Sequence, residues 1–200
     1  MNKQLNIQLL FKSLANINMA TPINPKLAGA THAYQTALPE CVVQAHGNAW
    51  QLCGRGIFVW TVFRCYWASL YTQSGRFEEE LPAILDLSYL RTLSKEQTIL
   101  ISIDEMLRLH PEHSDRGQAW RDALAQIIPD VKAGDRLVGY FDPTRGANFY
   151  SDHAPLGAIQ EPAFAATFLS IWLDPATRAS ALREALLGQP QTSQLREVLS

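Results

Sequence analysis

The chain has 200 residues, of which 47% are hydrophobic and 18% are charged, and its formal net charge is −2 at pH 7. This length suggests one domain, with or without an extension, and the apolar content can build a sizeable core, which excludes an intrinsically disordered protein. A net charge so close to zero supplies no overall electrostatic attraction to nucleic acid or to an anionic membrane.

The N-terminal segment, residues 1–38, is predicted to be a poorly ordered leader or a degenerate export signal. Residues 5–11 faintly resemble the apolar region of a signal peptide, but Asn6, Gln8 and Lys12 interrupt it. A polar leader is the favoured interpretation. The compartment stays open on the residues alone.

The first predicted element is a short hairpin of two strands, residues 41–45 and 49–53. A loop centred on Gly47 places Cys41 directly opposite Cys53, where Cβ atoms lie about 4.5–5.5 Å apart, close to the range of a disulfide. The alternative is two reduced, half-buried thiols, which we favour slightly because the redox compartment is unknown.

Two further strand regions follow. Residues 54–71 are rich in β-branched and aromatic residues, which predicts one long strand or two strands joined at a bend. After a turn at residues 74–76, another strand is predicted over residues 84–91. The residues that share one face of this strand are Leu85, Leu87, Tyr89 and Arg91.

Arg91 is therefore expected on the apolar-facing side of its strand, beside Tyr89. A cation there could anchor an anionic or enolate-like ligand in a pocket. It could also pair with a carboxylate at the sheet edge, and on the residues alone we favour this structural interpretation.

Two helices are predicted next. Residues 94–97, Ser-Lys-Glu-Gln, form a capping box, in which the Ser94 hydroxyl accepts a hydrogen bond from the backbone of Gln97. This helix should end near Leu109, because a proline follows at position 111. A second helix is predicted over about residues 115–128.

The last third of the chain is predicted to contain a hairpin, a short strand and two helices. The hairpin strands are residues 136–141 and 147–150, and the short strand is residues 156–159. The central element is a helix over residues 162–173, whose surface is apolar almost all round, so that it must be buried on several sides. A closing helix ends near Gly188, and residues 189–200 form a polar tail.

This order of elements predicts an α+β fold with a largely antiparallel sheet. The chain carries no nucleophile elbow, phosphate-binding loop or C-x-x-C pair. His110 and His113 are the one close histidine pair, but Pro111 breaks the helix that would align their rings, and no metal site is predicted. Gly54 and Gly56, inside a strand pattern, indicate a bulge or a close approach of another backbone.

Several stretches, taken together, resemble the chalcone isomerase-like family, and specifically its bacterial branch. They are residues 64–71, residues 85–91 with the helix that follows Ser94, residues 130–136, residues 164–173 and residues 182–188. The resemblance covers a domain at residues 39–188. It implies an open-faced β-sandwich, in which a large antiparallel sheet carries helices layered on one face, with a cleft between.

The resemblance also implies a choice of functions. Plant members close a flavanone ring without a cofactor, related plant proteins bind fatty acids, and bacterial members often carry an export signal. The arginine of the plant enzymes aligns with Phe58 here, their catalytic threonine with Tyr66, and their helix tyrosine with a position near Thr98. Loss of the cation removes a group that would stabilise a developing enolate.

The leading hypothesis from the sequence is therefore a protein that is not a true chalcone isomerase and that holds a small apolar ligand, such as a fatty acid, in the cleft. The expected ligand contacts are Tyr66, Tyr89, Arg91 and Thr98, with no catalytic residue, metal or cofactor. The alternatives are a cofactor-independent isomerase acting on an α,β-unsaturated ketone, and a structural or interaction domain whose cleft is filled. The resemblance favours a periplasmic location, or a cytoplasmic one if the N-terminus is not an export signal.

Overall fold

The computed structural model describes residues 37–60 and 62–188. The predicted leader over residues 1–38 lies outside the described residues except for its last two positions, and the predicted tail over residues 189–200 lies wholly outside them. Both remain predictions.

The described chain forms one six-stranded antiparallel sheet in which each strand pairs with its neighbours in sequence, in the order β1-β2-β3-β4-β5-β6. The strands are β1 (Gln51–Trp60), β2 (Phe63–Thr72), β3 (Ala83–Tyr89), β4 (Arg136–Asp142), β5 (Gly146–Tyr150) and β6 (Pro155–Ile159). The helices are α2 (Glu40–His46), α3 (Lys95–Leu109), the 3₁₀ turn η2 (Pro111–His113), α4 (Gly117–Ile127), α5 (Pro162–Leu173) and α6 (Ser180–Leu186). The predicted α+β class and antiparallel sheet are confirmed.

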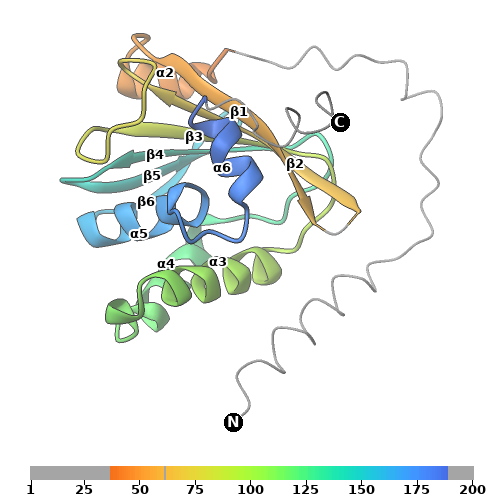
Figure 1. Ribbon diagram of the computed structural model, residues 1–200, viewed down its shortest axis with the longest axis vertical. Coiled ribbons are helices and arrows are strands. Elements are labelled where there is room, and N and C mark those ends of the chain that lie inside the picture. The colour runs from red at the N-terminus through yellow and green to blue at the C-terminus, as the bar shows by residue number, and fades with distance from the viewer. Residues whose placement is uncertain (1–36, 61, 189–200) are drawn as a thin grey trace, which may run out of the picture. The chain divides into compact units, whose positions relative to one another are not determined.

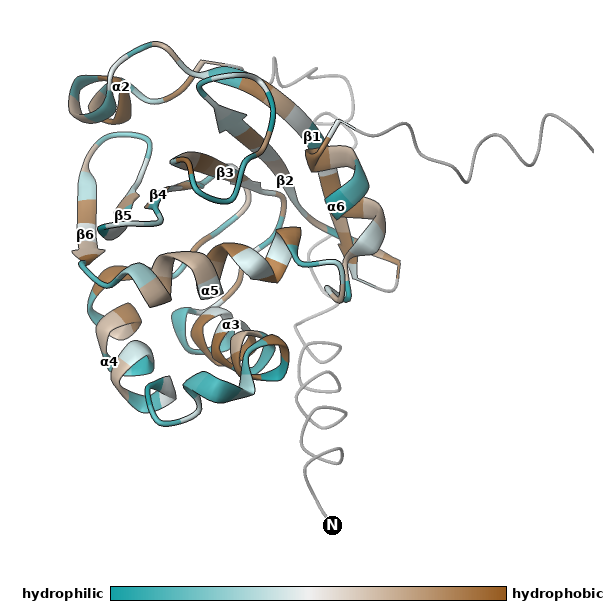
Figure 2. Ribbon diagram, turned by 60° about the vertical axis from the view of Figure 1, so that its left-hand side comes forward, coloured by the Kyte–Doolittle hydropathy of each residue, from teal (hydrophilic) through white to brown (hydrophobic). Residues whose placement is uncertain are grey.

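The helices are layered mainly on one face of the sheet. Helix α5 packs on β4 and β5, α6 packs on β1, and α3 lies against α5 and α4 (Figure 1). Figure 2 shows α5 between the sheet and α3, with hydrophobic residues along most of its length. Its boundaries are those predicted, and its Phe164 and Phe168 rings stack with centroids 5.3 Å apart inside the core.

The capping box of α3 is also confirmed, with both of its reciprocal hydrogen bonds present. For residues 54–71 the sequence predicted either one long strand or two strands. The structure has two, β1 and β2, which pair with each other as a hairpin. Strand β1 has a register shift between Leu52 and Gly54. A Cβ atom on Gly54 would lie 2.2 Å from the carbonyl oxygen of Ala185 in α6, so the predicted bulge and the predicted close backbone approach both occur here.

The predicted hairpin around Gly47 is wrong. Residues 40–46 form helix α2, which ends where Gly47 adopts a φ of 82°. The helix packs Val42 against four residues on the face of the sheet opposite α5: Tyr71, Ile84, Val138 and Tyr150. Burial of this side chain on the sheet outweighs the strand preference of the adjacent valines at positions 42 and 43.

Without that hairpin, the cross-strand position that would have joined Cys41 to Cys53 does not exist. Cys41 lies on α2, where its thiol is 3.7 Å from the carbonyl oxygen of Ser151, and Cys53 lies on β1. Cys41, Cys53 and Cys65 are all free thiols in the structure, and the redox state of Cys41 and Cys53 stays a prediction.

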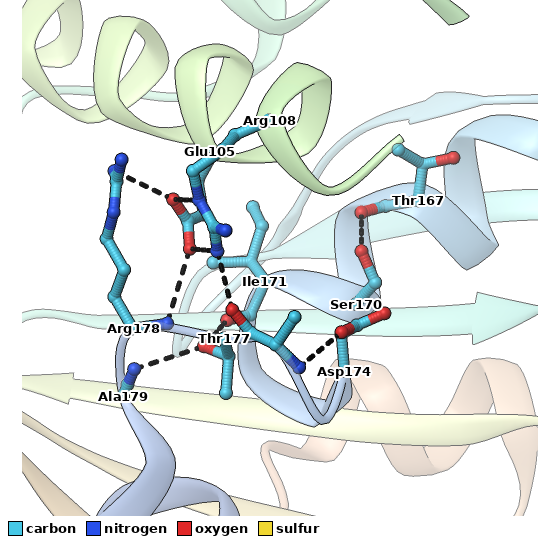
Figure 3. A network of polar contacts seen from close by, with 10 residues as sticks. Glu105, Arg108, Thr167, Ser170, Ile171, Asp174, Thr177, Arg178 and Ala179 are labelled. Atoms are coloured by element: carbon cyan, nitrogen blue, oxygen red, sulfur yellow. Dashed lines mark hydrogen bonds and ion pairs between the residues drawn. The ribbon is translucent and has the colours of Figure 1, made fainter. Parts of the chain in front are cut away.

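A polar network ties α3 to the connection between α5 and α6 (Figure 3). The carboxylate of Glu105, which is 6% exposed, accepts hydrogen bonds of 2.6 and 2.8 Å from Arg108 and lies 2.9 Å from Arg178. Burial opposes ionisation of Glu105, but the hydrogen bonds from Arg108 and the charge of Arg178 outweigh it and lower its pKa. Arg108 also donates to the carbonyl of Ala176, so the network holds the connection onto α3.

Candidate functional site

The residues that the sequence predicted as ligand contacts centre on a group of aromatic side chains, Phe58, Tyr66, Tyr89 and Trp172, which we call the tyrosine cluster. Phe58 on β1 is the cross-strand partner of Tyr66 on β2, and Tyr66 is the partner of Tyr89 on β3. Cross-strand partners point to the same side of a sheet, so the three rings form a row. The Phe58 and Tyr66 centroids are 5.0 Å apart, and those of Tyr66 and Tyr89 are 5.7 Å apart.

Helix α5 contributes the fourth member of the cluster. The indole N–H of Trp172 donates a 3.0 Å hydrogen bond to the Tyr66 hydroxyl. Trp172 is buried beside Phe168, with ring centroids 5.5 Å apart. Because α5 is apolar almost all round, its residues alone do not select the side that faces the sheet; the hydrogen bond from Trp172 fixes the orientation of the Tyr66 phenol.

The two phenols of the cluster are held neutral. Burial raises the pKa of Tyr66, and the opposing hydrogen bond from Trp172 is the weaker influence. Burial alone raises the pKa of Tyr89, which is 3% exposed. Neutral phenols donate a hydrogen bond but supply no charge.

The two hydroxyls differ in how they are satisfied. Tyr66 accepts the Trp172 bond, and its own O–H proton remains available. The Tyr89 hydroxyl makes no hydrogen bond to any residue in the described part of the chain, and it is not among the fully buried polar atoms that lack a partner there. Because the Tyr89 hydroxyl is unpartnered but not fully enclosed, it could donate a hydrogen bond to an acceptor on a bound molecule.

Arg91 lies apart from this arrangement. Strand β3 ends at Tyr89, and the predicted extension of the strand to Arg91 is wrong. Beyond β3, the backbone N–H of Leu90 bonds to Cys65, and the exposed Arg91 guanidinium stacks 4.4 Å from the centroid of the Phe63 ring. The partner of Arg91 is therefore an aromatic ring on β2. The carboxylate that the sequence led us to expect at the sheet edge is not its partner in the structure.

Thr98 is half-buried in the first turns of α3, and its hydroxyl donates a 3.1 Å hydrogen bond to the carbonyl oxygen of Ser94 in the same helix. Of the four predicted contacts, the structure brings Tyr66 and Tyr89 together. It gives Arg91 and Thr98 partners of their own.

Sequence reasoning did not propose Phe58 or Trp172 as members of a site. Phe58 could have been proposed, because the resemblance already aligned it with a catalytic position of the plant enzymes. Its pairing with Tyr66 across β1 and β2 then places the two rings side by side. Trp172 was recognised as a core residue of its helix. Its hydrogen bond to Tyr66 joins residues 106 positions apart, and no local pattern signals such a contact.

Within residues 37–60 and 62–188, no group of three or more His, Cys, Asp or Glu side chains is arranged to hold a metal ion. The His110 and His113 ring centroids lie 6.2 Å apart, but His110 contacts Glu112 and His113 packs edgewise on Trp120. Among the helices in the same part of the chain, none is both long enough and apolar enough to cross a membrane.

Comparison with known proteins places this geometry in a family. A family model described as chalcone isomerase-like matches residues 30–188. A Haemophilus influenzae protein, described only as an uncharacterized protein, is 26% identical over 145 residues, which are 72% of this chain and 71% of that protein.

A solved structure shares the fold. The crystal structure of a fatty-acid binding protein from Arabidopsis thaliana matches with a TM-score of 0.55, covering 70% of this chain and 88% of that chain. At 9% sequence identity the likeness extends to the fold alone. The predicted architecture, a large antiparallel sheet with helices layered on one face, is thereby confirmed.

Proposed function

The chain belongs to the chalcone isomerase-like family, and from this premise we propose that it binds a small apolar ligand at the tyrosine cluster and holds it without converting it. The observation that carries the proposal is the Tyr89 side chain, which is 3% exposed, lies in a row of aromatic rings and has a hydroxyl with no hydrogen-bonding partner among the described residues. Ligand sites are typically apolar surfaces with a few placed polar groups.

A fatty acid or a similar lipid is the ligand class that we propose. Its apolar body matches the rings of Phe58 and Trp172, and its head group supplies an acceptor for the phenols of Tyr66 and Tyr89. The fatty-acid binding protein that shares the fold supports the same class. Arg91 and Thr98 stay in the proposal as outer contacts, each of which would have to leave its present partner to reach a ligand.

The residues of the cluster weigh against ring-closing catalysis. The position that aligns with the arginine of the plant enzymes holds Phe58, whose ring stacks on Tyr66. Electrostatic stabilisation of a developing oxyanion is often worth several kcal/mol, and a phenylalanine supplies none of it. A neutral Tyr66 phenol can still polarise a carbonyl, so turnover of an α,β-unsaturated ketone is the second outcome to assay.

The test is native mass spectrometry of the purified full chain, followed by denaturing extraction of any bound molecule. We expect a co-purified lipid, or an added fatty acid, to shift the mass of the wild type. The fatty acid should bind at least fivefold more weakly to Tyr89→Phe, because that variant lacks one hydrogen bond between neutral groups. Tyr140→Phe is the matched control, because Tyr140 packs with α2 on the opposite face of the sheet.

A mass that stays unliganded after incubation with fatty acids would reject the proposal and would favour the structural domain, with its interior filled by its own side chains. Turnover of an α,β-unsaturated ketone without added cofactor, slowed in Tyr66→Phe, would instead establish the isomerase. Equal binding by the wild type and Tyr89→Phe would remove the tyrosine cluster as the site.

A further inference from the structure

The closed end of the β1–β2 hairpin reaches beyond the rest of the sheet (Figure 1). Strand β3 pairs with β2 only from Tyr66 onward. Phe63 and Arg64 pair with β1 alone. At this end β1 and β2 therefore pair only with each other, because β1 is an edge strand and β3 does not extend this far.

The side chains at this end are unusually apolar for such a position. Val62 is 82% exposed, Val59 is 45% exposed and Phe63 is 38% exposed. Leu90 is 38% exposed and adjoins them, since its backbone bonds to Cys65. We call these four residues, with Arg64 and Arg91, the hairpin tip.

The charge at the hairpin tip has one sign. Arg64 is exposed on β2, and the Arg91 guanidinium lies over the Phe63 ring. The two sequence segments that build the tip carry no aspartate or glutamate, from residue 41 to residue 77 and from residue 87 to residue 95. An apolar surface is thus bordered by two guanidinium groups, with no acid in the same segments.

We propose that the hairpin tip docks on the surface of an anionic phospholipid bilayer. In this arrangement Val62 and Phe63 enter the boundary between head groups and acyl chains, while Arg64 and Arg91 extend to the lipid phosphates. The attraction is local, acting within a Debye length of the surface, and so it operates despite the net charge of −2.

The composition of the tip distinguishes this partner from a protein. A stable protein interface buries roughly 800 Å² on each partner, which four side chains on a narrow projection do not supply. A second copy of the chain, docked tip to tip, would bring four guanidinium groups together, and their like charges would repel. A bilayer requires no complementary shape and offers the opposite charge.

The test measures co-flotation of the purified full chain with phosphatidylcholine vesicles and with vesicles that also contain phosphatidylglycerol. We expect the wild type to float with the anionic vesicles, and to be released by high salt. Val62→Asp should weaken binding about tenfold or more, by placing a carboxylate among the head groups, and Arg64→Gln about fivefold. Both substitutions are at exposed positions, so folding should be retained.

The matched controls lie at the opposite end of β2, in the loop before β3. The control variants are Leu81→Asp and Arg76→Gln, which make the same changes in polarity and charge as the tip variants. Leu81 is 46% exposed, and Arg76 is also exposed. These controls should float as the wild type does. Every variant keeps residues 1–36, so a difference between variants does not report on that segment.

Three results would overturn the inference. The first is failure of the wild type to float with either vesicle, and the second is an equal loss of binding in the tip and control variants. The third is a changed oligomeric state of Val62→Asp in size-exclusion chromatography while vesicles bind no protein, which would identify the hairpin tip as a protein interface. None of these readouts depends on the ligand proposed for the tyrosine cluster.

Discussion

Arg136 holds Asp86 through two hydrogen bonds, of 2.8 and 2.5 Å, between adjacent strands of the sheet. Both side chains are almost fully buried, at 5% and 3% exposure. Arg136 also contacts Asp152, which is 32% exposed, at 3.2 Å. The pair lies on the face of the sheet opposite the tyrosine cluster, because Asp86 alternates with Leu85 and Leu87 along β3.

Asp86→Asn should destabilise the fold by about 3 kcal/mol, because it leaves the buried Arg136 without its principal counter-charge. Asp152→Asn removes the more exposed partner and should cost less than about 1 kcal/mol. Urea denaturation of the two variants measures the difference. A double variant, Asp86→Leu with Arg136→Met, should recover most of the loss, since it removes both charges together. Equal effects of the two asparagine variants would contradict this account.

The extent to which sequence predicted the fold depends on where each element draws its stability. Helix α5 and the capping box of Ser94 and Gln97 were predicted correctly because their signals lie within a few residues of each other. Helix α2 was not, because what favours it is the packing of Val42 on Ile84 and Val138, residues that lie 42 and 96 positions further along the chain. No pattern within residues 40–46 records those contacts.

The candidate site divides in the same way. Tyr66 and Tyr89 came from a family resemblance, and strand pairing then placed them side by side. The expected position of Arg91 assumed that β3 continues for two more residues, but the chain turns after Tyr89 to reach α3. Predicting where a strand ends requires knowledge of its partner strand, which the residues of β3 do not carry.

Removal of the hydroxyl from each of the two tyrosines of the cluster should change the free energy of unfolding by different amounts. Tyr66→Phe leaves the buried Trp172 indole N–H without its acceptor and should cost about 1–3 kcal/mol. Tyr89→Phe removes a hydroxyl that bonds to no described residue, so it should leave stability nearly unchanged. Chemical denaturation of both variants checks the contrast. A loss in Tyr89→Phe as large as that in Tyr66→Phe would mean that the Tyr89 hydroxyl has a structural partner.

Helix α2 should make stability depend on pH. Burial lowers the pKa of His46, although the charge of Asp142 opposes this. The His46 ring stacks on Tyr140 with centroids 3.6 Å apart, and its Nε2 atom lies 2.7 Å from the Tyr150 hydroxyl. The unfolded chain then binds a proton at a higher pH than the folded chain does, so the free energy of unfolding should fall as the pH drops below about 6.5.

The measurement is the urea midpoint of the wild type and of His46→Gln between about pH 7 and pH 5. The variant should show a weaker dependence across this window, and the exposed His153→Gln should follow the wild type. Asp142 and Glu105 have lowered pKa values, so their contributions are lost at more acidic pH and do not enter the window. An identical slope in the wild type and His46→Gln would exclude His46 as the source.

The cysteines give a direct chemical check of the corrected N-terminal structure. Because Cys41 lies on α2 and Cys53 on β1, and both are free thiols in the structure, thiol titration of the denatured, non-reduced chain should find three free thiols. A count of one, rising to three after reduction, would show that a disulfide forms in spite of this arrangement.

The neutral phenols of the tyrosine cluster should make fatty-acid binding depend on pH. Tyr66 and Tyr89 donate hydrogen bonds without charge, and burial of an ionised carboxylate beside them would be costly. The site should therefore prefer the protonated acid, and affinity should rise as the pH falls toward the pKa of the fatty acid. The methyl ester of the same acid has no such group, and its affinity should stay constant.

Isothermal titration of both ligands across about pH 8 to pH 6 measures this difference, because the protonated fraction of the acid rises about tenfold for each unit that the pH falls, while the carboxylate still predominates. Affinity for the acid that is independent of pH, or that weakens as the pH falls, would mean that a cation reaches the carboxylate. The available candidate is Arg91, leaving the Phe63 ring. In that case Arg91→Gln would reduce affinity for the acid and leave affinity for the ester unchanged, which separates a charged anchor from the neutral one that the tyrosine cluster provides.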